Sequence, residues 1–199
     1  MLAADEVARW EPVPGSLVAI PRANVQAIAS FVRTTGEIGD LNRFYPGNAE
    51  STFLMERMAA EIVALAREFG AELLLDMHES WAFYREYPGT GTGALGQTVT
   101  IGAGPRGRDY GQAILDAVNP GFSERERMLI RDGSPFGRSD PSSAPAAGGR
   151  GRSSLAVGGF VPGLTPVLVE MGQEDQDLDR RVELHIVVAK AVLELTGVL

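Results

Sequence analysis

The sequence predicts an α/β fold: a three-layer α/β/α arrangement with a mixed, mostly parallel central sheet. Two apolar runs, residues 72–80 (ELLLDMHES) and 164–172 (LTPVLVEMG), each end in polar residues, which is typical of buried parallel strands. An amphipathic segment over residues 54–69 directly precedes the first run, so helix and strand signals alternate. The 199 residues fit a single domain over residues 1–199 with a sizeable core.

The first half of the chain adds three weaker elements. Residues 3–10 resemble the end of a helix, residues 16–21 (SLVAIP) predict a short buried strand that proline ends, and residues 23–31 are weakly helical. Residues 40–47 (DLNRFYPG) read as a loop because they end in Pro-Gly.

The amphipathic segment predicts a helix that Asn48 or Ser51 caps and Gly70 ends. Its apolar residues recur at steps of three and four, so we expect one stripe to face the core. That stripe consists of Leu54, Met58, Ile62, Leu65 and Phe69.

The second half contains a short strand near Val99, a helix over residues 108–118 and a closing helix over residues 177–195. His185 lies among apolar residues of the closing helix, so we interpret it as a core or surface residue and not as a ligand. Residues 131–163 are low in complexity and predict a flexible loop, either a surface insertion or a lid over a site.

Composition excludes several classes of protein. A net charge of -8 argues against a general nucleic-acid binder, and the absence of cysteine excludes disulfides and thiolate metal sites. No apolar run is long enough for a transmembrane helix, so no membrane partner is expected. The N-terminal residues as given lack the apolar region of a signal peptide, which predicts a cytoplasmic protein.

Polar residues at three places suggest chemistry. His78 and Glu170 end the two apolar runs, and ligands of open α/β sheets bind beyond the carboxyl ends of strands. A neutral imidazole is a good zinc ligand, a glutamate beside a metal-bound water can act as general base, and Asn42 with Arg43 can bind a carboxylate. Each also has a structural alternative: His78 can be a structural histidine, Glu170 can cap a loop, and Arg43 can form an ordinary salt bridge.

The order of these segments resembles a known family. GSLVAIPRANVQAI, DLNRFYPG, LLLDMHES and TPVLVEMG occur in the order and rough spacing of the succinylglutamate desuccinylase/aspartoacylase branch of the zinc carboxypeptidase superfamily. The likeness covers most of residues 12–199 and is weakest over about 82–160. Asp-Met-His stands where the family usually has Asp-Leu-His.

This resemblance implies a zinc carboxypeptidase-like fold and zinc-dependent hydrolysis of an N-acyl amino acid or a related amide or ester. It implies that His78 is a zinc ligand, that Asn42 and Arg43 bind the substrate carboxylate, and that Glu170 is the catalytic glutamate. Arg33 resembles the arginine that polarises the scissile carbonyl, although its spacing matches only loosely. Asp40 is expected to brace the loop.

One part of the family pattern is missing. The first two zinc ligands of the family come from an HxxE motif, and no HxxE and no histidine precede His78. A catalytic zinc usually has three protein ligands, so zinc binding and activity of this chain are expected to be impaired. We expect the chain to begin just after the motif, and a lost core strand to expose apolar surface and favour a homo-oligomer.

Three hypotheses therefore stand. The chain is an N-terminally incomplete zinc hydrolase, a non-catalytic relative that binds small carboxylates, or an interaction domain in which the motifs are remnants. In the first two the partner is a small-molecule carboxylate such as an acyl amino acid.

Overall fold

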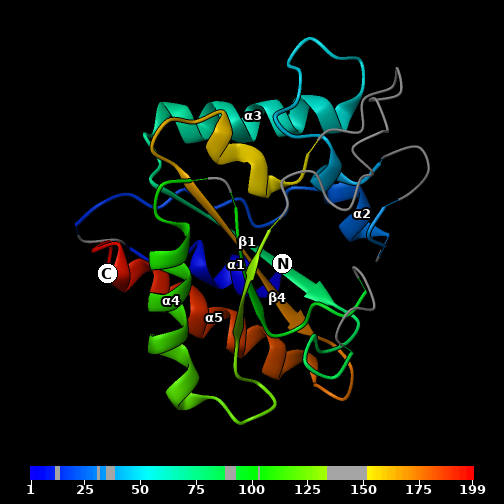
Figure 1. The fold of residues 1–199 in the computed structure, drawn as a ribbon. Coiled ribbons are helices and arrows are strands. Elements are labelled where there is room, and N and C mark those ends of the chain that lie inside the picture. Colours follow the sequence, from blue (N-terminus) through cyan, green and yellow to red (C-terminus); the bar gives the residue numbers. More distant parts are fainter. Residues whose placement is uncertain (12–13, 31, 35–38, 88–92, 103, 134–151) are drawn as a thin grey trace.

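The computed structural model describes the chain except for residues 12–13, 31, 35–38, 88–92, 103 and 134–151 (Figure 1). Its helices are α1 (Leu2–Val7), α2 (Val25–Ala29), α3 (Leu54–Glu68), α4 (Gly107–Val118) and α5 (Leu178–Leu195). Its strands are β1 (Leu73–Ser80), β2 (Thr98–Ile101), β3 (Leu129–Asp132) and β4 (Thr165–Gly172). Three short 3-10 helices are η1 (Leu41–Arg43), η2 (Asn119–Gly121) and η3 (Ser154–Gly159).

The four strands form one mixed sheet in the order β1-β4-β2-β3. β1 pairs with β4 and β2 with β3 in parallel, whereas β2 and β4 are antiparallel. All eight residues of β4 are buried, which explains its continuous apolar run, whereas most of β1 is half-buried because β1 lies at the end of this order. The predicted α/β fold with a mixed, mostly parallel sheet is confirmed.

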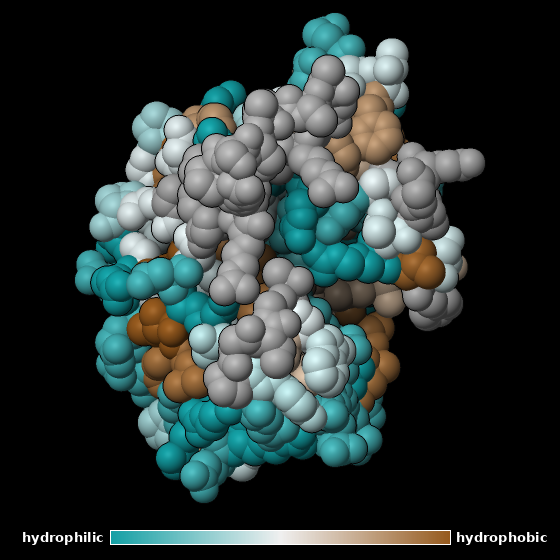
Figure 2. All heavy atoms as spheres, turned by 45° about the vertical axis from the view of Figure 1, so that its right-hand side comes forward, coloured by the Kyte–Doolittle hydropathy of each residue, from teal (hydrophilic) through white to brown (hydrophobic). Residues whose placement is uncertain are grey.

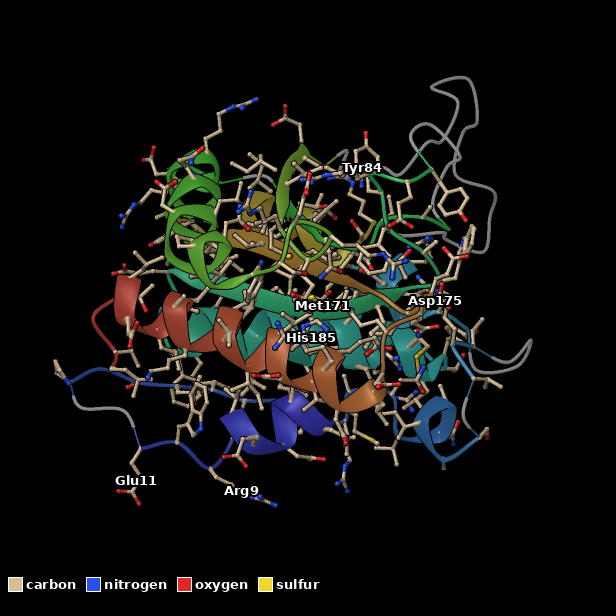
Figure 3. All side chains as sticks on the ribbon, turned by 90° about the horizontal axis from the view of Figure 1, so that it is seen from below. Arg9, Glu11, Tyr84, Met171, Asp175 and His185 are labelled. Carbon is tan, nitrogen blue, oxygen red and sulfur yellow. The ribbon has the colours of Figure 1, made fainter. Side chains whose placement is uncertain are left out.

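Helices cover both faces of the sheet. One core lies between the sheet and α4 and α5, and it includes Val167, Val169 and Met171 of β4. The other lies between the sheet and α3, where Leu164 and Leu74 contact residues of α3 and η3. Because side chains alternate along a strand, the even-numbered residues of β1 and β4 face the α3 side. Figure 3 shows Met171 and His185 together on the opposite, α5 side, where His185 is buried.

The prediction for the core-facing stripe of α3 is wrong. The buried residues of this helix are Met55, Ala59, Val63 and Ala66, whereas the predicted stripe is half-buried or exposed. The loop of residues 40–47 also approaches this helix closely: a Cβ on Gly47 would lie 2.2 Å from the amide nitrogen of Ala60. Periodicity found the helix correctly but not which of its two apolar faces is covered.

Two other expectations change. Residues 16–21 form no strand, because no neighbouring strand pairs with them in the described part, and Val18 and Ile20 remain exposed. The predicted loop over residues 131–163 is too long: its start belongs to β3 and its end contains η3. The alternatives of insertion and lid concern residues 134–151, which lie outside the described residues.

None of the described helices combines the length and the apolar character that crossing a membrane would require.

Candidate functional site

The candidate site lies at the carboxyl ends of β1 and β4. His78 and Glu170 occupy paired positions in the parallel register of these strands, so both side chains point to the α3 face. Asp76 lies two residues before His78 and shares that face. Figure 2 turns this end of the sheet toward the reader and shows hydrophilic side chains gathered in the middle of the surface.

His78 and three other residues, from three elements in all, form one cluster. Nε2 of His78 lies 3.1 Å from Oδ2 of Asp76 and 3.4 Å from Nδ2 of Asn42 in η1. Ser154 of η3 donates from its hydroxyl to the same Asp76 oxygen at 2.6 Å, and from its backbone nitrogen to Oδ1 of Asn42 at 2.7 Å. The fold thus brings together the predicted residues His78 and Asn42 with Asp76 of the same strand, and it adds Ser154.

Asp40 connects the two predicted arginines to this group. One of its oxygens accepts the backbone N–H of Asn42 and so caps the start of η1. The other accepts hydrogen bonds from Nε and Nη2 of Arg33, each at 3.0 Å. Nη1 of Arg43 lies 3.9 Å from that second oxygen and donates to the backbone oxygen of Asn42. Asp40 therefore braces the loop as expected. It engages the hydrogen-bond donors of Arg33 but only approaches those of Arg43.

Electrostatics favour an ionised Asp76 beside a protonated His78. Burial acts to raise the pKa of Asp76, but the charge of His78 and the hydrogen bonds from His78 and Ser154 hold that pKa below its ordinary value. Burial acts to lower the pKa of His78, but the charge and hydrogen bond of Asp76 raise it well above its ordinary value. Nε2 of His78 therefore carries a proton and donates it in a hydrogen bond to Asp76.

Glu170 is almost completely buried, with an exposed fraction of 7%. Burial raises the pKa of its carboxyl group, while the positive charges of His78 and Arg33 act against that rise. In the described part of the chain, its Oε2 is buried without a hydrogen-bond partner. A buried carboxyl group with a raised pKa beside a histidine suits an acid–base role.

The residues present do not fit a catalytic zinc ion. Among the described residues no group of three His, Asp or Glu side chains is placed to hold a metal. One ring nitrogen of His78, Nε2, is already directed at Asp76. Three protein ligands are the usual minimum for catalytic zinc, and the described residues do not supply them.

Sequence reasoning missed Ser154 because it placed this residue in a low-complexity loop. Nothing in the local sequence marks it, since its partners lie 78 and 112 residues away along the chain. Asp76 carried a better signal, because it shares a strand face with His78.

Residues 4–83 match the family model described as the succinylglutamate desuccinylase/aspartoacylase catalytic domain. The matched range contains Arg33, Asn42, Arg43 and His78 but not Glu170. The resemblance that the motifs predict is therefore confirmed for this part of the chain. No curated protein matches the chain.

Solved structures share the fold. The tripeptide-bound cell shape determinant Csd4 from Helicobacter pylori superposes with a TM-score of 0.67 at 14% identity, over 90% of this chain and 43% of that chain. The product-bound ectoine utilization protein EutE from Ruegeria pomeroyi gives 0.65 at 20% identity, over 100% and 53%. A succinylglutamate desuccinylase/aspartoacylase from Rhodobacter sphaeroides gives 0.60 at 18% identity, over 100% and 51%. The chain spans about half the length of these structures.

Proposed function

We propose, from the relation of residues 4–83 to the succinylglutamate desuccinylase/aspartoacylase catalytic domain, that this chain binds the carboxylate of a small N-acyl amino acid. The observation that carries the proposal is the cluster of N–H donors around Asn42, Arg43 and His78. Arg43 is the principal donor, because Asp40 holds Arg33 through two hydrogen bonds but lies 3.9 Å from Arg43.

The experiment is an NMR titration of the purified chain with N-acetyl-L-glutamate and, separately, with its diamide, in which both carboxyl groups are amides. We expect the acid to bind and the amide to bind far more weakly, because only the acid offers a carboxylate to the guanidinium. Arg43→Ala should weaken binding of the acid by about tenfold, the usual effect of losing one charged hydrogen-bonding partner. Arg108→Ala is the matched control, since Arg108 is an exposed arginine paired with Asp132 on α4 and β3. Equal binding of acid and amide would refute the proposal.

Hydrolysis is the second candidate function, and the observation that favours it is Glu170. Its raised pKa and its position opposite His78 suit the transfer of a proton to a leaving amine. The resemblance implies zinc for this reaction, and the described donor set is too small to hold it. We expect the purified chain to retain no stoichiometric zinc and to release no amine from N-acyl amino acids. One zinc per chain, lost in His78→Ala, together with turnover that Glu170→Gln abolishes, would establish the hydrolase instead.

A further inference from the structure

Ser154 connects three segments that are distant in sequence. It begins η3, its exposed fraction is 1%, and it donates hydrogen bonds to Asn42 of η1 and Asp76 of β1. Two residues earlier, the backbone of Arg152 exchanges hydrogen bonds of 2.9 and 3.0 Å with that of Tyr45. The segment that carries Ser154 is therefore attached to the loop of residues 40–47 as well as to the sheet.

The contact with Ser154 decides how the Asn42 amide is oriented. A backbone N–H only donates, so the amide oxygen of Asn42 must face Ser154 and its NH₂ group must face His78. Nε2 of His78 cannot accept from this NH₂ group while it donates to Asp76. The contact with the carboxylate is shorter and charge-assisted, so it prevails. The amide protons of Asn42 are then left for an acceptor outside this group.

Ser154 does not have the geometry of a nucleophile. A serine nucleophile needs a base that accepts its proton, and in the familiar arrangement that base is a histidine. The Ser154 hydroxyl donates instead to Asp76, an oxygen that His78 already shares. The serine therefore acts through its neighbours.

We propose that Ser154 is a positioning residue, which fixes the Asn42 amide through its backbone N–H and the Asp76 carboxylate through its hydroxyl. In this arrangement the NH₂ group of Asn42 lies beside His78, and its protons are available to the carboxylate of the ligand. The identity of the ligand rests on the proposed function, whereas the orientation of Asn42 does not.

Two substitutions separate the two contacts. Ser154→Ala removes only the hydroxyl, and Ser154→Pro also removes the backbone N–H. Proline suits the first position of a helix, and Ser153 has the extended backbone (φ -72°, ψ 169°) that a following proline requires. Ser153→Ala is the matched control, because the buried hydroxyl of Ser153 has no hydrogen-bond partner within the described residues.

The first readout is the NMR spectrum of the ligand-free protein. The chain has two histidines, so one His185→Gln spectrum assigns the ring nitrogens of both, and Asn42→Asp assigns the side-chain amide. We expect Ser154→Pro to move the Asn42 amide and His78 ring signals, and Ser154→Ala to move the His78 signals alone. The His185 signals should stay in place in both, which distinguishes a local effect from a general loss of structure.

The second readout is binding of N-acetyl-L-glutamate, which we expect to weaken about threefold in Ser154→Ala and about tenfold in Ser154→Pro. Spectral changes as expected in a chain that binds no N-acyl amino acid would refute the proposed function and support the positioning role. Unmoved Asn42 signals in Ser154→Pro, or equal changes in Ser153→Ala, would overturn the positioning role. If Ser154→Pro fails to fold, as circular dichroism would show, unmoved His78 signals in Ser154→Ala would overturn it.

Discussion

Residues of the same type have different environments in this protein, and their contacts decide what each can do. Arg33 and Arg43 were both expected to bind substrate, yet Arg33 makes two hydrogen bonds of 3.0 Å to Asp40, whereas Arg43 lies 3.9 Å from the same Asp40 oxygen. The sequence could identify both arginines as candidates for binding a carboxylate. How strongly a neighbouring carboxylate neutralises each arginine depends on distances that only the fold sets.

Glu126 illustrates the same point for stability. Arg180 of α5 donates to both of its oxygens, at 2.6 and 3.0 Å, and these hydrogen bonds lower the pKa of Glu126 to about 2. A depressed pKa stabilises the folded state above the unfolded pKa near 4.5, and this stabilisation disappears as pH falls from there toward 2. Glu126→Gln should therefore lower the free energy of unfolding at pH 7 by about 1–2 kcal/mol, once the partial exposure of Arg180 is allowed for.

The measurement is urea unfolding of the native and Glu126→Gln proteins between pH 7 and pH 2. We expect the gap between them to close below pH 4.5, and a gap independent of pH would contradict the role of the ionised carboxylate. Glu183→Gln is the control: Glu183 also contacts Arg180, but its side chain is 60% exposed, so the change should stay below about 0.5 kcal/mol.

At the scale of elements, the loop of residues 40–47 is set by its contact with α3. Gly47 has φ +84°, and a Cβ there would lie 2.2 Å from the amide nitrogen of Ala60 and 2.3 Å from the carbonyl oxygen of Glu56. The neighbouring Asn48 donates its backbone N–H to that same carbonyl at 3.0 Å. This close approach also places η1, and therefore Asn42, over the end of β1.

We predict that Gly47→Ala lowers the free energy of unfolding by more than about 2 kcal/mol, because the added methyl group meets helix backbone that cannot yield easily. Gly70→Ala is the matched control: Gly70 also has positive φ (+58°), but nothing lies within 4 Å of a Cβ there. That substitution should cost about 1 kcal/mol, the cost of the left-handed backbone alone. Equal losses in urea unfolding would show that the contact with α3 does not matter.

The whole molecule leaves apolar surface uncovered on one side. Leu54, Met58, Ile62 and Leu65 of α3 line a groove of about 400 Å³ together with Ile20. In addition, β1 is an edge strand, because no strand in the described part of the chain pairs with its outer side. The homo-oligomer expected from the sequence remains a prediction, and this surface is its physical basis.

We expect sedimentation velocity to show concentration-dependent self-association that Leu54→Lys combined with Met58→Lys reduces. Their apolar side chains lie on the groove side of α3 rather than among its buried residues. Leu178→Lys combined with Val187→Lys is the control, because both residues are exposed on α5 and the change in net charge is the same. Equal effects of the two pairs would assign the change to charge and contradict a role of the groove.

The sequence by itself determined the main helices and strands, α3, α4, α5, β1 and β4, and that His78 and Glu170 lie near the ends of two strands. Those features depend on local periodicity, which neighbouring residues carry. It did not determine which face of α3 is buried, that β3 and η3 form within the predicted loop, or that Ser154 contacts Asn42 and Asp76. These depend on contacts between residues far apart in the chain, because burial and hydrogen-bond partners exist only once the elements have packed together.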